Sequence, residues 1–295
     1  MFPALFLCVL LVFASGCRNM TVVRQAPALT YTNDDPPLFL MFYYPYGPGL
    51  VRKLAQPVPD YSGWPDERMV RDIDRFTNTG VDVVVVAVDA DSTHEMYMQE
   101  RLSRFLGLCT EHGGKLQVAF FLYRGDGKTP WSDLEEAGSQ LVQWMVDPSV
   151  AYSPSYWRFE GRPALILDEA MTNLRISHPA LKIVRTKGIG GEWNLSSPSA
   201  QGGCVFNKNR TQAVVYGGYF TNGSWFLPRQ RGKTLKHALW TAFEARASVI
   251  CIASWNNFMR GSFVEPNNLD STELLDVLKH EIRRTRQSQL ASHPN

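Results

Sequence analysis

VICIASWNNFMRGSFVEP, residues 249–266, is the stretch that decides the fold. Its first five residues are apolar and mostly β-branched, which is typical of a strand buried on both faces of a parallel sheet. The run ends abruptly in Ser254, Trp255 and Asn256, so polar groups follow the strand at its carboxyl end. Proteins with α/β folds place their functional sites at that end. The stretch therefore predicts a parallel sheet with a site at its mouth.

Similar strands recur along the chain, and helical patterns separate most of them. The predicted strands cover residues 38–43, 81–88, 116–123, 162–167, 180–184, 213–216 and 249–253. Apolar residues at helical spacing predict helices at 66–78 and around Leu102, Leu141, Leu239 and Leu278. No Gly-rich phosphate loop follows the first strand, which argues against a doubly wound sheet. The alternation predicts an α/β fold, a single (β/α)8 TIM-type barrel with one shortened or irregular unit, located between 184 and 213.

The two ends of the chain have a different character from the middle. Residues 1–16 form an apolar run that ends in small residues, which predicts a signal peptide rather than a transmembrane helix. We expect a flexible tether at 17–35, the barrel at 36–286 and a disordered tail at 287–295. The residues before Cys17 also resemble a bacterial lipobox, so a lipid anchor, a short signal anchor and free secretion all stay open. The predicted location is the secretory pathway or another extracytoplasmic compartment.

Composition and net charge indicate which kinds of partner the protein is expected to bind. A net charge of +2 is too small to favour nucleic acid or an anionic membrane, so we expect no nucleic-acid partner, and membrane contact only through a lipid or signal anchor. The histidines are scattered without metal-ligand spacing, and we expect neither a metal nor another cofactor. Four N-glycosylation sequons, at Asn19, Asn194, Asn209 and Asn222, are compatible with a secretory protein. The 8 Trp and 11 Tyr supply rings that stack on sugar faces as well as core material.

Several segments resemble one known family, the endo-α-mannosidase-like glycoside hydrolases of family 99. Residues 254–265 are similar to the family signature S-(W/F)-N-E-W-x-E-G-x-x-(I/V)-E, and residues 43–49 to its F-Y-x-W-Y-G segment. Residues 71–88 and 162–168 resemble its second strand and its P-x-x-x-V-Y-D strand, in the same order and spacing. The resemblance implies a barrel and a cleft for an α-linked, mannose-containing glycan or oligosaccharide at the carboxyl ends of the strands.

The sequence departs from the family where that family carries its acids. Asn257 and Arg260 stand in place of two glutamates of the signature, and the third family carboxylate falls at Tyr123. An amide cannot accept the proton that glycoside hydrolysis transfers, and a guanidinium cannot give one at neutral pH. The resemblance therefore supports the scaffold more strongly than the activity.

Other carboxylates at predicted strand ends are candidates for a relocated catalytic pair, because glycoside hydrolysis needs two carboxyl groups. The catalytic candidates are Asp168 with Asp89 or Glu169, while Asp91 and Glu192 are further carboxylates in the same regions. The predicted substrate-binding residues are Tyr43, Tyr44, Tyr46, Trp193, Trp255, Asn256, Asn257, Arg260 and Glu265. The first hypothesis is an exported glycoside-hydrolase-like protein acting on α-linked glycans. The alternatives are a carbohydrate-binding pseudoenzyme and a tethered scaffold without sugar affinity.

Overall fold

A computed structural model describes most of the predicted barrel. The described residues are 36–45, 54–59, 63–90, 96–124, 130–171, 174–186, 193, 195, 197–198, 202–258 and 260–292. The predicted signal peptide and tether, residues 1–35, lie outside this part, and so do Tyr46, Asp91 and Glu192.

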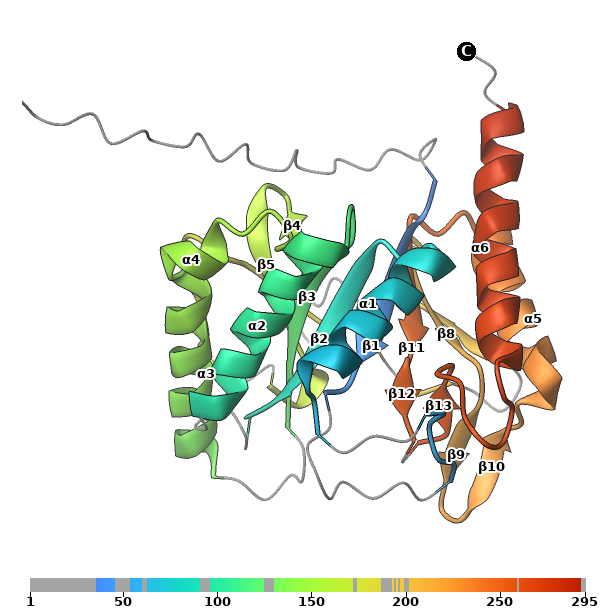
Figure 1. Ribbon diagram of the computed structural model, residues 1–295, viewed down its shortest axis with the longest axis horizontal. Helices are drawn as coiled ribbons and strands as arrows, with labels where there is room; N and C mark the ends of the chain where they lie inside the picture. Colours follow the sequence, from blue (N-terminus) through green and yellow to red (C-terminus); the bar gives the residue numbers. More distant parts are fainter. Residues whose placement is uncertain are drawn as a thin grey trace, which may run out of the picture.

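Parallel strands form the centre of the molecule (Figure 1). In the described part of the chain, the strands that pair in parallel are β1 (Leu38–Tyr43), β2 (Val83–Asp89), β3 (Gln117–Tyr123), β5 (Arg162–Leu167), β6 (Lys182–Arg185), β8 (Gln212–Tyr216) and β11 (Val249–Ala253). Their spatial order is β6-β5-β3-β2-β1-β11-β8. The first strand thus lies between the second and the last. This strand order is that of a TIM barrel, because a doubly wound sheet instead reverses its order at an interior strand.

The irregular part of the barrel lies where the sequence predicts it. A short 3-10 helix, η2 (Glu169–Met171), follows β5, and β7 (Cys204–Phe206) pairs antiparallel with β8. Another short strand, β4 (Arg158–Phe159), pairs antiparallel with the start of β5. Within the described ranges, no pairing joins β6 to β7 or β8. The predicted α/β fold of TIM-barrel type is confirmed, and its regular alternation fails between β5 and β8.

Helices cover the outer side of the strands. They are α1 (Asp66–Thr79), α2 (Met96–His112), α3 (Trp131–Val146), α4 (Pro148–Ala151), the 3-10 helix η3 (Gln230–Gly232), α5 (Lys233–Glu244) and α6 (Glu273–Ser292). Figure 1 shows α1 and α2 across the front, α3 and α4 at one side, and α5 and α6 at the other. Helix α6 continues through 287–292, where the sequence predicts the start of a disordered tail. None of the helices in the described ranges is long and apolar enough to cross a membrane.

Two hydrophobic clusters occupy the two faces of the sheet. Along β1, Leu40 and Phe42 belong to the inner cluster, while Met41 and Tyr43 belong to the outer cluster against the helices. This division follows from the strand itself, since successive side chains point to opposite faces. The same alternation decides which residues at the ends of the strands face the barrel interior.

Two short hairpins extend the carboxyl-end side of the barrel, at the lower edge of Figure 1. One joins β9 (Tyr219–Thr221) to β10 (Ser224–Leu227), and the other joins β12 (Asn256–Asn257) to β13 (Ser262–Phe263). The backbone N–H of Phe220 donates to the carbonyl oxygen of Arg260 at 2.7 Å, so the hairpins contact each other. They build one side of the site.

Candidate functional site

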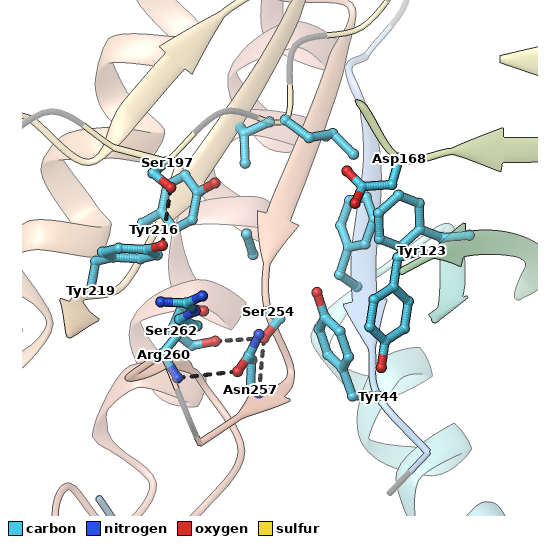
Figure 2. A pocket seen from close by; sticks show the side chains of 15 residues that line it. Tyr44, Tyr123, Asp168, Ser197, Tyr216, Tyr219, Ser254, Asn257, Arg260 and Ser262 are labelled. Atoms are coloured by element: carbon cyan, nitrogen blue, oxygen red, sulfur yellow. Dashed lines mark hydrogen bonds between the residues drawn. The ribbon is translucent and has the colours of Figure 1, made fainter. Parts of the chain in front are cut away.

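A cavity of about 200 Å³ lies at the carboxyl ends of the parallel strands (Figure 2). Tyr44 directly follows β1, Tyr123 ends β3, Asp168 directly follows β5 and Tyr216 ends β8. The remaining lining residues are Phe42, Phe121, Leu195, Ser197, Val214, Tyr219, Ala253, Ser254, Asn257, Arg260 and Ser262. Parallel strands start on one side of a sheet and finish on the other, which is why these distant residues meet.

Aromatic rings form much of the cavity wall. The rings of Tyr44 and Tyr123 are 5.9 Å apart at 77°, and those of Phe121 and Tyr123 are stacked at 5.9 Å. On the other side, Tyr216 and Tyr219 meet edge to face, also at 5.9 Å. Such walls present flat apolar faces with hydroxyl groups at their edges, an arrangement that suits the mixed apolar and polar surface of a sugar.

Asp168 is the carboxylate among the described residues that line the cavity. Burial raises the pKa of its carboxyl group above the ordinary value, the backbone N–H of Glu169 opposes this shift, and the charge of Glu169 adds to it. A raised pKa keeps the proton on a carboxyl group to higher pH. Asp168 therefore combines access to the cavity with the property that a proton donor needs.

Tyr44 interacts electrostatically with both charged groups of the cavity. Burial raises the pKa of its phenol to about 12; the hydrogen bond with Asn257 lowers it, and Asp168 and Arg260 act on it in opposite directions. The Tyr44 hydroxyl therefore stays protonated across the physiological range and serves as a neutral hydrogen-bonding group.

The turn after β11 presents Asn257 and Arg260 to the cavity. The Ser254 hydroxyl donates to the carbonyl oxygen of Ser262 and accepts from the backbone N–H of Asn257 at 2.9 Å. The Asn257 side-chain oxygen then accepts from the backbone N–H of Arg260 at 3.2 Å. Asn257 thus shapes the turn as well as lining the cavity (Figure 2).

The structure brings together four of the predicted site residues and places others elsewhere. Tyr44, Asp168, Asn257 and Arg260 all line the cavity. Tyr46 lies outside the described residues. Tyr43, Trp193, Trp255, Asn256 and Glu265 are buried outside the lining, and the carboxylates Asp89 and Glu169 lie next to the cavity.

Tyr43 and Trp255 are buried on the helix-facing side of the sheet, away from the cavity. The Tyr43 hydroxyl donates to the Asp72 carboxylate at 2.9 Å, and the Trp255 ring lies 4.9 Å from the ring of Phe76. Their positions assign both to the core in place of the predicted sugar contact. The reason is the strand alternation, which turns Tyr43 outward between the inward-facing Phe42 and Tyr44.

Asn256 is fully buried and joins the ends of two strands. Its side-chain amide donates to the carbonyl oxygen of Tyr44 at 2.8 Å, and its side-chain oxygen accepts from the backbone N–H of Tyr44 at 2.9 Å. Asn256 therefore positions Tyr44 and is not itself among the lining residues. Asn256 therefore contributes to the site through Tyr44.

Trp193 and Glu265 are also buried outside the lining of the cavity. The indole of Trp193 lies 6.0 Å from that of Trp157, within the inner cluster. Glu265 is fully buried, and the side-chain amide of Asn267 donates to its backbone oxygen at 2.8 Å. Neither position supports the direct substrate contact predicted from the sequence.

The remaining carboxylate candidates lie next to the cavity but do not line it. Asp89 ends β2 and is the cross-strand partner of Tyr123. Glu169 is exposed at the start of η2. The structure thus places Asp168 inside the cavity and its two proposed partners outside it.

Several lining residues are not among those predicted from the sequence, although two of them follow the same rule as the predicted ones. Tyr123 and Tyr216 end predicted strands, so their positions at carboxyl ends were a usable signal. Tyr219 and Ser197 carried no such signal, because they come from the irregular part and from a hairpin. Their hydroxyl oxygens lie 3.0 Å apart. In the described ranges, no group of three or more His, Cys, Asp or Glu side chains is placed to hold a metal ion.

Solved structures share this architecture. A GH99 endo-alpha-mannosidase from Bacteroides thetaiotaomicron, in complex with BIS-TRIS-propane, superposes with a TM-score of 0.66 at 17% identity, covering 89% of this chain and 100% of the other. The chain has the fold of the GH99 endo-alpha-mannosidases. A second structure of the Bacteroides thetaiotaomicron enzyme gives a TM-score of 0.63 at 15% identity, covering 88% and 99%.

A third neighbour, described as a glycoside hydrolase-like protein, gives a TM-score of 0.57 at 11% identity, covering 87% of this chain and 96% of its own. No protein-family model matches the chain, and no curated protein sequence matches it. The similarity of this chain to the GH99 structures is therefore a similarity of backbone shape and strand order, at low sequence identity. It confirms the predicted structural resemblance, whereas function has to be argued from the site.

Proposed function

We propose that this protein binds an α-linked, mannose-containing glycan in the cavity at the carboxyl ends of its strands. The observation that carries the proposal is the lining, in which Tyr44, Tyr123, Tyr216 and Tyr219 surround an opening that also contains Asn257. Phenol rings stack on sugar faces while hydroxyl and amide groups exchange hydrogen bonds with sugar hydroxyls. The named activity of the GH99 neighbours, endo-alpha-mannosidase, supports mannose as the sugar.

Glycoside hydrolysis is the second candidate function, and the raised pKa of Asp168 favours it. A protonated Asp168 is suited to give its proton to the leaving glycosidic oxygen, and a second carboxylate must then act as base or nucleophile. Asp89 is the nearest candidate along the sheet. It lies two strands from Asp168, with β3 between them, which corresponds to roughly 10 Å between backbones. Because the second carboxylate is outside the cavity lining, binding is the better supported function.

Calorimetry and product analysis with an α-linked mannobiose separate the two functions. Binding without release of mannose supports a carbohydrate-binding protein and rejects hydrolysis. Release of mannose that disappears in Asp168→Asn supports hydrolysis with Asp168 as the acid. Tyr123→Ala should weaken binding at least about tenfold, since it removes a stacking ring and a hydroxyl. Tyr152→Ala is the matched control, because Tyr152 is 57% exposed and lies outside the cavity lining.

We also propose that the protein is exported, which the apolar run at residues 1–16 supports. Expression of the full chain in a secreting host tests the proposal. Mass spectrometry of the product should show a mature chain that starts near Cys17. Retention of the intact amino terminus in the cytosol would reject it.

A further inference from the structure

Two charged side chains of opposite sign line the described part of the cavity. Among the 15 lining residues, they are Asp168 and Arg260. Figure 2 shows Asp168 on one wall and the Arg260 side chain on the opposite wall, near Tyr219. The cavity is therefore polarised from one wall to the other. A ligand that carries charge has one preferred orientation in such a field.

The Arg260 guanidinium differs from those of Arg229 and Arg286 in its partners. Arg229 pairs with Asp270 at 2.6 Å, and Arg286 pairs with Asp82 at 2.7 Å. In the part of the chain that the structure describes, Arg260 makes its hydrogen bonds through the backbone, and its guanidinium forms no ion pair. Five N–H donors and one positive charge are thus available on the wall of the cavity.

The turn that carries Arg260 is firmly held. The buried Arg229 donates to the carbonyl oxygens of Gly261 and Phe263, each at 2.8 Å. The carbonyl oxygen of Arg260 itself accepts from the backbone N–H of Phe220 at 2.7 Å. The backbone of the turn therefore fixes the point from which the exposed Arg260 side chain extends along the cavity wall.

Guanidinium groups bind carboxylate, sulfate and phosphate oxygens through paired, charge-assisted hydrogen bonds. The hydroxyl of Tyr219 and the side chain of Asn257 line the same side of the cavity and can complete the coordination. Asp168, on the opposite wall, accepts hydrogen bonds from sugar hydroxyls in either protonation state, and when ionised it also repels an anion. The two walls therefore recognise different parts of one ligand.

We propose that the glycan bound in this cavity carries an anionic group, a carboxylate, sulfate or phosphate ester, and that Arg260 binds it. This inference rests on the proposed sugar-binding function. It assigns the anion to the β11–β13 side of the cavity and the neutral sugar ring to the tyrosine walls.

Calorimetry with four probes tests the assignment: methyl α-mannopyranoside, its 6-phosphate, its 6-sulfate and the corresponding uronate. At least one anionic probe should bind about tenfold more tightly than the neutral mannoside, as one charge-assisted hydrogen bond implies. Arg260→Gln should remove most of that preference, and Arg260→Lys should retain part of it. Raised salt should reduce it in the wild type. Arg283→Gln, an exposed arginine on α6, is the control and should keep the full preference.

Each alternative result has one meaning. Equal binding of neutral and anionic mannosides, or a preference that survives in Arg260→Gln, overturns the anion assignment and leaves sugar binding standing. Binding of inorganic phosphate as tightly as of the mannose phosphate overturns a sugar-borne anion. Absence of binding to every mannoside rejects the proposed function itself and this inference with it.

Discussion

Tyr43 and Tyr44 are neighbours in the chain with opposite surroundings. Tyr43 is fully buried on the helix side, where its hydroxyl donates to Asp72, a carboxylate that is itself fully buried. Tyr44 faces the cavity, held by Asn256. One residue of strand register therefore separates a group that stabilises the fold from a group that meets the ligand.

Phenylalanine substitutions at these two positions should have different effects. Tyr43→Phe leaves the buried Asp72 carboxylate with one hydrogen bond fewer, and we expect it to lower the free energy of unfolding by about 1–3 kcal/mol with little effect on mannoside binding. Tyr44→Phe should cost less stability and weaken mannoside binding several-fold. Urea denaturation and calorimetry on both variants check this. A larger loss of mannoside binding in Tyr43→Phe than in Tyr44→Phe would contradict the assignment of Tyr44, and not Tyr43, to the ligand-binding face.

The half-buried carboxyl of Asp168 should make stability depend on pH. Because its pKa is raised in the folded state, the native protein holds the proton more tightly than the unfolded chain. Its contribution to stability therefore falls as pH rises from the ordinary carboxyl value through the raised value, and the penalty is complete above that window. Asp168→Asn should raise the Tm at pH 7 and change it little near pH 4. An equal rise in Tm at both pH values would contradict the raised pKa of Asp168.

At the scale of single elements, two glycines in neighbouring helices serve opposite purposes. Gly80 ends α1 in the left-handed region, with φ at +91°, and its N–H donates to the carbonyl oxygens of Phe76 and Thr77. A Cβ there would lie 3.1 Å from the Ile282 side chain of α6. Gly107 lies inside α2, where an added Cβ meets no neighbouring atom within 4 Å.

Alanine substitutions distinguish the two glycines. Gly80→Ala should lower the free energy of unfolding by about 1–2 kcal/mol, because the left-handed conformation is unfavourable for a residue with a Cβ. Gly107→Ala should raise it by up to about 1 kcal/mol, since alanine favours the helix. Urea denaturation monitored by circular dichroism measures both. Destabilisation by Gly107→Ala would show that the α2 surface is more crowded than the structure indicates.

At the scale of the whole molecule, α6 packs against the segment between α1 and β2, about 200 residues earlier in the chain. Leu274, Leu278 and Ile282 are buried in the outer cluster. Arg286 then donates to the carbonyl oxygen of Gly80 at 2.9 Å and to the Asp82 carboxylate at 2.7 Å. The helix therefore stabilises the start of β2 as well as covering the outside of the barrel.

Two truncated chains test how much α6 contributes to the stability of the fold. A chain that ends at Arg286 keeps the buried face of α6 and should unfold within a few degrees of the full chain. A chain that ends at Thr272 loses three buried aliphatic side chains, each worth about 2–5 kcal/mol, which together approach the whole stability of a domain. It should lack a cooperative thermal transition. A cooperative melt in the shorter chain would show that the barrel is stable without α6.

The sequence by itself determined the class of fold and part of the site. Apolar β-branched runs such as 83–88 and 249–252 locate buried strands, and their alternation with helical patterns requires parallel order. Residues that directly follow such strands, Tyr44 and Asp168, lie where strand ends converge. These inferences need only local pattern and chain order.

The tertiary structure alone decided which face each residue takes and which distant residues meet. A strand that is apolar on both faces has no alternating pattern, so its sequence does not reveal that Phe42 points inward and Tyr43 outward. The same ambiguity put Trp255 in the predicted site, although its ring packs against Phe76. Arg260 faces Asp168 across the cavity because the β12–β13 hairpin folds back on the barrel, a long-range contact that no local pattern records.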